Sequence, residues 1–275
     1  MKFASATLAA LMLGALSAAS AAPIQLSAQG MDAAAILPTV TAFRTALGAL
    51  NANVAVSFNG GRREINWDGV PDNRAAPSNL PANFFNVNSP RGAVFGTPGT
   101  GFQVSAKTGI APVRFDNINP TYSELFQTFS PQRLFTALGS SITDVNFFVP
   151  GSAALASVSA FGAVFTDVDL ANITSLQFFD LDNQSLGAYF VPSATGNQTL
   201  SFLGVRFDAG ERIGRVRITS GNAALGGNDG GATDLVVMDD FIYAEPLAVV
   251  PEPATLLLVA APLAALVALR RRRQR

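Results

Sequence analysis

Cysteine and histidine are both absent from the 275 residues of this chain. Catalysis by a serine, threonine or cysteine nucleophile with a histidine base is therefore excluded, and so are zinc, iron and copper sites with cysteine or histidine ligands. Disulfides are excluded as well, so stability must come from a buried core, and any bound cation must be held by oxygen atoms.

Aromatic residues other than phenylalanine are few, with 3 tyrosines and 1 tryptophan against 21 phenylalanines. This much phenylalanine allows a sizeable core to be buried. A length of 275 residues suits one large domain or two small ones. No spacer rich in serine, threonine and proline divides the chain and no internal repeat is visible, so we expect one domain, residues 23–246.

Basic residues are scarce in the middle of the chain. Of the 18 basic residues, five lie at the C-terminal end and one is Lys2, which leaves 12 basic against 18 acidic residues from Pro23 to Pro251, a net charge of −6. A folded part with this charge and with scattered arginines lacks the basic surface of a nucleic-acid-binding protein. We therefore expect no nucleic-acid partner.

Residues 1–22 have the composition of a secretory signal peptide. Lys2 precedes an apolar stretch, residues 8–16, and a run of small residues, 17–22, ends before Pro23. This order predicts export and cleavage by signal peptidase after Ala21 or Ala22. A buried N-terminal helix is the alternative.

Residues 247–275 contain a short motif, an apolar stretch and a basic cluster. The motif is Val250-Pro251-Glu252-Pro253, the stretch covers residues 254–269, and the cluster is Arg270-Arg271-Arg272-Arg273. A helix over the stretch is about 24 Å long, shorter than the roughly 30 Å hydrocarbon core, but it can span the membrane when the arginines reach the interface. The arginines are expected to stay cytoplasmic, so the main domain lies on the exported side. A plain tail anchor is the alternative.

This C-terminal order resembles the PEP-CTERM sorting signal of Gram-negative bacteria. The resemblance implies an inner-membrane intermediate, recognition by an exosortase, cleavage near Pro251-Glu252-Pro253, and delivery to the cell surface or an exopolysaccharide matrix. Residues 62–70, 83–92 and 237–243 also resemble segments of the exported β-sandwich domains that accompany such tails. They imply no particular activity.

Alternation of apolar and polar residues dominates the central part. In residues 214–219, Val216 and Ile218 face one way and the polar residues face the other, as in a half-buried strand. Further strands are expected at residues 54–58, 92–95, 102–105, 113–115, 144–149, 159–165, 175–180, 186–191, 199–205 and 235–243. Their close spacing predicts an all-β fold, an antiparallel β-sandwich of the jelly-roll or lectin-like type, because βαβ units would need amphipathic helices in the gaps.

One segment, residues 37–50, has helical spacing. Pro38 suits a first turn, and Val40, Phe43, Leu47 and Leu50 fall on one face. We expect this short N-terminal helix to pack over an end or an edge of the sandwich. Residues 60–101 are rich in proline, glycine and asparagine and are expected to form long ordered loops with short strands.

Acidic residues indicate a calcium site. Asp167 and Asp169 share one side of an extended chain, and Asp240 lies in an apolar strand, where an ionised carboxylate facing the core is costly unless it is paired or metal-bound. In lectin-like sandwiches a loop Asp-x-Asp and an aspartate on a late strand often hold one structural calcium, and the pattern here is similar. The prediction is a Ca²⁺ site formed by Asp167, Asp169 and Asp240. The alternative is that these acids are solvated turn residues or partners of Arg206, Arg212 or Arg217.

A second candidate site surrounds the single tryptophan. Asn66, Trp67 and Asp68 can line a sugar-binding face, because aromatic rings stack on pyranoses beside amide and carboxylate groups. The alternative is a Trp67 pinned into the end of the sandwich. Residues 226–231, Gly-Gly-Asn-Asp-Gly-Gly, lack the strand and helix of a phosphate-binding loop and are interpreted as a flexible surface loop.

The remaining catalytic option is a pair of carboxylates, as in glycoside hydrolases. Such enzymes usually have a deep cleft with several aromatic platforms, which 1 tryptophan and 3 tyrosines hardly supply, so we expect no enzymatic activity. The sequence as a whole predicts an exported structural or adhesive component of the cell surface or exopolysaccharide matrix. The alternatives are a carbohydrate-binding module with a polysaccharide partner and, third, a carboxylate-based glycoside hydrolase.

Overall fold

The computed structural model describes residues 22–107, 109–110 and 113–249. The predicted signal peptide, except Ala22, lies outside this part of the chain. So do Val250, Pro251, Glu252 and Pro253, the apolar stretch and the arginine cluster. Within the described residues, no helix combines the length and the apolar character needed to cross a membrane.

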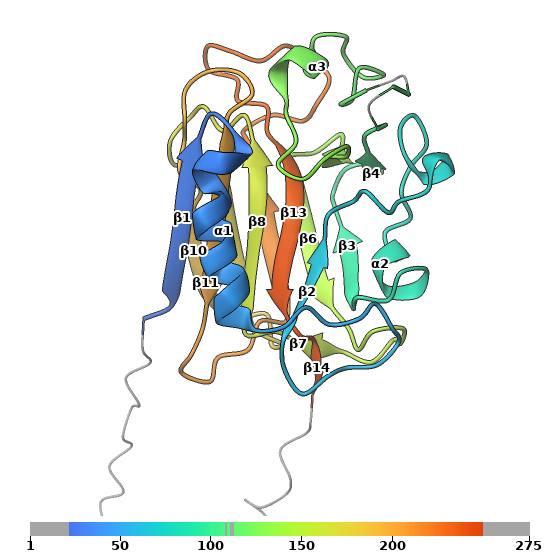
Figure 1. The fold of residues 1–275 in the computed structure, drawn as a ribbon, viewed down its shortest axis with the longest axis vertical. Helices are drawn as coiled ribbons and strands as arrows, with labels where there is room; N and C mark the ends of the chain where they lie inside the picture. Colours follow the sequence, from blue (N-terminus) through green and yellow to red (C-terminus); the bar gives the residue numbers. More distant parts are fainter. Residues whose placement is uncertain (1–21, 108, 111–112, 250–275) are drawn as a thin grey trace, which may run out of the picture.

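The fold is mostly β, and two antiparallel sheets lie face to face (Figure 1). Sheet A contains β1 (Ile24–Gly30), β11 (Leu200–Arg206), β8 (Ala160–Thr166), β13 (Val237–Ala244), β5 (Phe135–Leu138) and β4 (Gly101–Val104) in spatial order, and β2 (Arg62–Ile65) also pairs with β13. Sheet B contains β10 (Ser185–Phe190), β9 (Ser175–Phe179), β12 (Arg215–Thr219), β6 (Ile142–Phe147) and β3 (Ala93–Gly96). A small ribbon joins β7 (Ala156–Ser157) to β14 (Leu247–Ala248). The prediction of an antiparallel all-β fold is confirmed.

The alternation of apolar and polar residues in the sequence identifies the strands that are buried on one face only. Buried and half-buried residues alternate along β6, β9 and β12, whereas β8 and β13 are buried throughout. The strands predicted at residues 54–58 and 113–115 are wrong. Residues 54–56 form bends, residues 57 and 58 have no regular structure, and Val113 makes only an isolated bridge with Ala106. β1, β5 and β7 were not predicted, β2 lies within residues 60–101, where short strands were expected, and β14 extends the fold two residues beyond the predicted boundary at residue 246.

The single long helix, α1 (Ala33–Leu47), begins earlier than predicted. Its N-cap is Asp32, whose side chain accepts a hydrogen bond from the Ala35 N–H at 2.9 Å, and Pro38 therefore lies inside the helix rather than in its first turn. The buried residues Ile36, Val40, Phe43 and Leu47 form one face. That face packs on the outer side of sheet A near β1, so the helix covers a sheet face and not an end of the sandwich (Figure 1).

Two glycines allow α1 to lie close to the sheet. Gly162 of β8 and Gly204 of β11 are direct partners in the sheet. A Cβ atom added at Gly204 would lie 2.7 Å from the Phe43 ring, and one added at Gly162 would lie 2.9 Å from it. The ring therefore occupies the space that two side chains would otherwise fill.

Most buried apolar residues form one core between the sheets and under α1. Phe147 of sheet B contacts Phe161 and Tyr243 of sheet A, with ring centroids 6.3 and 5.5 Å apart. A smaller cluster lies at one end, beside α3 (Tyr122–Leu125), and contains Phe115, Tyr122, Leu125, Phe126, Leu134, Leu235 and Val237. Short helical turns, α2 (Phe84–Val87) and η1 (Asp72–Arg74), lie in the long loops.

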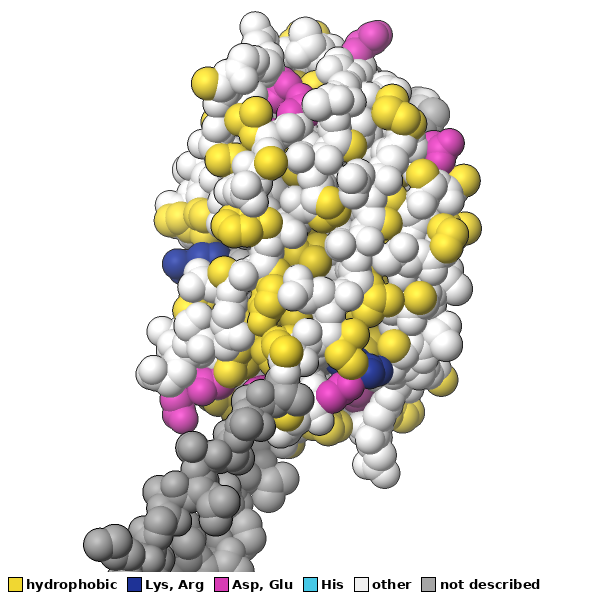
Figure 2. Space-filling view, turned by 90° about the vertical axis from the view of Figure 1, so that its left-hand side faces the viewer, with side chains coloured by type: hydrophobic (Ala, Val, Ile, Leu, Met, Phe, Trp, Pro, Cys, Tyr) yellow, Lys and Arg dark blue, Asp and Glu magenta, His cyan; other side chains and the backbone are white. Residues whose placement is uncertain are grey.

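The first and last described strands mark one end of the molecule. The first residues of β1 and the whole of β14 lie at this end, whereas α3 and the loops around it lie at the opposite end (Figure 1). β1 and β10 are the edges of the two sheets on the side seen in Figure 2, where hydrophobic side chains gather and charged ones are few. Neither edge strand contains a charged residue, and Phe190 of β10 is 53% exposed.

Candidate metal centre

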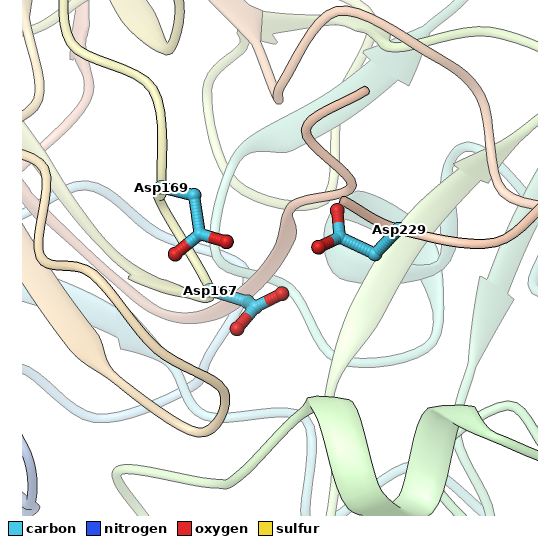
Figure 3. Close-up of side chains that lie close together, drawn as sticks. All are labelled: Asp167, Asp169 and Asp229. Atoms are coloured by element: carbon cyan, nitrogen blue, oxygen red, sulfur yellow. The ribbon is translucent and has the colours of Figure 1, made fainter. Parts of the chain in front are cut away.

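Two loops meet at the end of the sandwich that carries α3. Asp167 and Asp169 follow β8, and Asp229 lies in the glycine-rich loop that precedes β13. One carboxylate oxygen from each of these residues lies within 4.8 Å of the other two. Figure 3 shows the three side chains turned toward one another. The structure thus brings together the predicted Asp167 and Asp169 with a third acid that was not predicted.

Asp167 is the innermost of the three residues. Its side chain is 0% exposed, and neither of its carboxylate oxygens has a hydrogen-bond partner in the described part of the chain. Its backbone has a φ of 70°, in the left-handed region that aspartate tolerates better than most residues, and its N–H donates to the Thr199 carbonyl at 3.0 Å. A buried carboxylate without a partner is rare, because its desolvation is not compensated.

The surroundings of Asp167 oppose its ionisation. Burial, together with the charges of Asp169, Asp229 and Asp234, raises the pKa of Asp167 to about 8. The nearby Gln198 N–H lowers this pKa in part, although it donates its hydrogen bond to the Leu125 carbonyl at 2.8 Å. Burial and the neighbouring acids outweigh this effect, so the described surroundings favour the protonated form of Asp167 when no cation is bound.

Asp234 positions the loop that carries Asp169. Its buried carboxylate accepts hydrogen bonds from the backbone N–H groups of Asp169, at 3.1 Å, and Leu170, at 3.3 Å. Burial raises the pKa of Asp234 to about 6, against the effect of these two bonds. Because the loop backbone engages both of its oxygens, Asp234 fixes the place of Asp169.

Backbone groups also fix the two outer carboxylates. Asp229 accepts a hydrogen bond from the Leu235 N–H at 2.8 Å, and Asp169 accepts one from the Gly196 N–H at 3.3 Å. Burial raises the pKa of Asp229, although the Leu235 bond acts in the opposite direction. Each of the two residues therefore has one oxygen engaged by the backbone.

No basic side chain neutralises this cluster. Among the described residues, none of Asp167, Asp169, Asp229 and Asp234 takes part in an ion pair. Calcium binds oxygen at about 2.3–2.6 Å, so two ligands of one ion lie up to about 5 Å apart. The separations of 4.8 Å or less fit within this span. The arrangement suits a hard divalent cation.

A hollow of about 400 Å³ opens beside the cluster. Asp169 and Asp229 form part of its wall, whereas Asp167 is not among the lining residues and so closes the cluster toward the protein interior. The rest of the wall consists of Thr121, Glu124, Leu125, Asn197, Asn228 and Gly230. The cluster is therefore closed on one side and open on the other.

Asp240 does not join this cluster, so its assignment as a third calcium ligand is corrected. Its carboxylate accepts hydrogen bonds from the Arg44 guanidinium at 2.8 Å and from the Ser130 hydroxyl at 2.7 Å. The register of β13 shifts between Met238 and Phe241, which places Asp240 toward α1. The expected arginine partner exists, but it is Arg44 and not Arg206, Arg212 or Arg217.

The predicted sugar-binding face at Asn66, Trp67 and Asp68 is also wrong. Trp67 is 1% exposed, stacks on Phe135 at 4.0 Å and donates its indole N–H to the Asp239 carbonyl at 2.9 Å. Asn66 is exposed, and Asp68 accepts a hydrogen bond from the Arg133 N–H at 3.2 Å. A sugar cannot stack on a ring that is buried in the core.

Asp229 was missed because the loop 226–231 was predicted to be flexible. The loop is held at several points: the Tyr122 hydroxyl donates to the Gly227 carbonyl at 2.8 Å, and Asn119 donates to the Asn228 side chain at 3.0 Å. The signal in the sequence is a lone acid among glycines and an asparagine, a composition that permits the tight turns of a ligand loop.

The site can therefore hold a cation between a buried carboxylate and an open hollow. Its three carboxylates converge on one point, whereas the two acids of a glycoside hydrolase flank a bond at about 5 Å or more. The chain matches no known family model, no curated protein and no solved structure.

Proposed function

We propose that this chain is an exported protein of the PEP-CTERM type that serves as a structural or adhesive component of the cell surface or exopolysaccharide matrix. Its domain is a jelly-roll or lectin-like sandwich that binds Ca²⁺ through Asp167, Asp169 and Asp229. Signal peptidase and an exosortase are its partners during export, and the C-terminal segment holds it in the inner membrane as an intermediate.

The limits of the fold support the proposed processing. The first strand begins at Ile24, next to the predicted signal-peptide cleavage site, and the last strand ends at Ala248, two residues before Val250. Cleavage at both sites would therefore leave every described strand intact. The core also needs no disulfide, because it contains many phenylalanines and is continuous between the sheets.

The observation that carries the calcium proposal is the buried, unpartnered carboxylate of Asp167. The carboxylates of the other buried acids have partners in the protein. Glu245 pairs with Arg63 at 2.6 Å and Asp240 with Arg44 at 2.8 Å, whereas Asp234 and Asp239 accept hydrogen bonds from backbone N–H groups. Asp167 instead faces two more acids. A divalent cation would compensate all three charges at once, because Ca²⁺ takes carboxylate oxygens as its preferred ligands.

A structural or adhesive role fits this site better than catalysis. A hydrolase would need two carboxylates on opposite sides of a bound sugar, one of them a general acid. Here one oxygen of each acid lies within 4.8 Å of the other two, so the three groups converge on one point instead. We therefore propose a role without catalysis at this cluster, in which the cation stabilises the loops at one end of the sandwich.

The test is a thermal melt of the purified full-length chain with calcium and with chelator. At free calcium of 100 times the dissociation constant, binding to the folded state alone contributes about 2.7 kcal/mol, which raises the melting temperature by several degrees in a domain of this size. Asp167→Asn should abolish the rise. Asp182→Asn, an exposed aspartate in the β9–β10 turn, should leave it unchanged. A melting temperature that ignores both calcium and chelator would refute the site.

A further inference from the structure

We propose that the cation held by Asp167, Asp169 and Asp229 binds two neighbouring hydroxyl groups of an uncharged polysaccharide, with the sugar in the adjoining hollow. This inference rests on the proposed calcium site and adds the ligand that the site presents to the outside. It places sugar recognition at the α3 end of the sandwich, away from Trp67.

The ligands supplied by the protein leave the ion unsaturated. Ca²⁺ takes about six to eight oxygen ligands. One oxygen of Asp169 and one of Asp229 accept backbone hydrogen bonds, so four carboxylate oxygens remain, two of them from Asp167. At least two coordination positions are then left for oxygens from outside the protein, the number that a pair of adjacent sugar hydroxyls supplies.

The open positions face the hollow. Asp167 lies on the interior side of the cluster, while Asp169 and Asp229 form part of the wall of the hollow. An ion bound among the three is therefore covered by protein on the side of Asp167 and accessible from the hollow. The volume of about 400 Å³ is enough to hold sugar residues beside the ion.

The wall of the hollow carries the groups that recognise hydroxyls. Glu124 and Asn197 are exposed, and neither side chain has a hydrogen-bond partner in the described part of the protein. Glu124 can accept hydrogen bonds, and the Asn197 amide can both donate and accept them. The wall contains no aromatic residue, so coordination and hydrogen bonds must replace the stacking that many sugar sites use.

The charge of the site selects an uncharged ligand. A dication offsets two of the negative charges of Asp167, Asp169, Asp229 and Asp234, and Glu124 adds another on the wall. Among the residues that the structure describes, no arginine or lysine lines the hollow. A polymer of uronic acids or sulfated sugars would be repelled, whereas a neutral glycan would not.

The position of the hollow makes it accessible on a tethered protein. The hollow lies beside α3, and the last described strand, β14, lies at the other end (Figure 1). A protein attached through its C-terminal end therefore presents the hollow away from the point of attachment.

The experiment measures binding of the full-length protein to immobilised mannan and galactan, whose sugars carry neighbouring hydroxyls, and to polygalacturonate. We expect calcium-dependent binding to at least one neutral polymer, loss of that binding with chelator, and no binding to polygalacturonate. The double variant Glu124→Ala/Asn197→Ala should weaken binding by about tenfold or more, because it removes one or two hydrogen bonds to the sugar. Asp182→Asn is the matched surface control.

Thermal melts on the same samples separate the two proposals. The double variant should gain the same calcium-dependent rise in melting temperature as the unchanged protein, because neither residue ligates the ion. If calcium raises the melting temperature but no neutral polymer binds, or polygalacturonate binds better, the sugar inference is overturned and the calcium site stands. Sugar binding that persists in chelator also overturns it. If calcium has no effect on melting, both proposals fail.

Discussion

Asp239 and Asp240 are consecutive residues of β13, yet both carboxylates contact the hydroxyl of Ser130, at 3.2 and 2.7 Å. Successive side chains of a regular strand point to opposite faces, and the shifted register between Met238 and Phe241 removes that alternation. The two buried acids therefore form a coupled pair between α1, β13 and the segment at Ser130.

The surroundings of the pair favour a proton on Asp239 rather than on Asp240. Burial raises the pKa of both residues, and the charge of Asp240 raises that of Asp239 further, while Ser130 and Arg44 favour an ionised Asp240. Asp239→Asn, which mimics the protonated acid, should lower the free energy of unfolding by less than about 1 kcal/mol. Asp240→Asn removes the partner of Arg44 and should cost about 1–3 kcal/mol. Urea denaturation measures the free energy of unfolding of both variants. Equal losses of free energy would mean that the proton is not on Asp239.

The raised pKa of Asp239 contributes to the pH dependence of stability, together with the raised pKa values of Asp167 and Asp234. The folded-state pKa of Asp239 is raised, so the folded protein holds a proton that the unfolded chain releases above about pH 4. The free energy of unfolding should therefore fall as the pH rises from about 4 toward that raised pKa. Asp239→Asn should reduce this slope between pH 5 and pH 7 in chelator, as measured by urea denaturation. An unchanged slope would contradict the assignment.

Gly204→Ala should destabilise the contact between α1 and sheet A. The added Cβ would lie 2.7 Å from the Phe43 ring and 2.9 Å from the Phe202 ring. Overpacking of this kind costs about 1–3 kcal/mol. Gly69→Ala is the control, since a Cβ there meets nothing within 4 Å. The fluorescence of the single, buried Trp67 reports unfolding of both variants, and equal midpoints would argue against close packing at Gly204.

Glu245→Gln should be among the most destabilising single changes of a charged residue. The Arg63 guanidinium is buried and contacts the Glu245 carboxylate at 2.6 and 2.8 Å. Loss of the negative charge leaves a buried cation without compensation, at a cost of about 3–5 kcal/mol. Asp208→Asn, whose partner Arg206 is in an exposed pair, should cost less than about 1 kcal/mol. If the two variants unfold at comparable urea concentrations, the backbone carbonyls that accept hydrogen bonds from Arg63 compensate its charge without Glu245.

Processing at both ends predicts a specific mass for the released protein. The material outside the cells should lack residues 1 to about 22 and the segment that follows the Pro251-Glu252-Pro253 region. Intact-mass spectrometry measures this directly. Released protein that still carries Arg270 to Arg275 throughout would rule out exosortase cleavage.

The sequence predicted the strands whose burial alternates, because the pattern itself records which face is covered. β12 is such a case, with Val216 and Ile218 buried and Arg215 and Arg217 reaching toward Asp144. The sequence of β2, Arg-Arg-Glu-Ile, shows no such alternation of apolar and polar residues. β2 holds the buried Arg63, whose partner Glu245 lies 182 residues away, so neither residue alone indicates that Arg63 lies in a strand and is buried.

The candidate site shows the same limit. Asp167 and Asp169 are close in sequence, and their spacing alone predicted a shared ligand position. Asp229 lies beside them because the loop before β13 folds back over α3. Asp240 lies elsewhere and binds Arg44. Local composition could not reveal either event, because both depend on contacts between distant segments.

The position of β13 determines how the domain responds to mechanical load. β13 lies inside sheet A, with β8 along one side and β2 and β5 along the other, and it is the last long strand before the C-terminal end. Tension applied at that end pulls β13 along its own axis, so its hydrogen bonds on both sides must shear together instead of opening one after another. β1, by contrast, is bonded only to β11 and can be peeled from the edge of the sheet. Tension at the end that follows β13 therefore loads more hydrogen bonds at once than tension at the end that precedes β1.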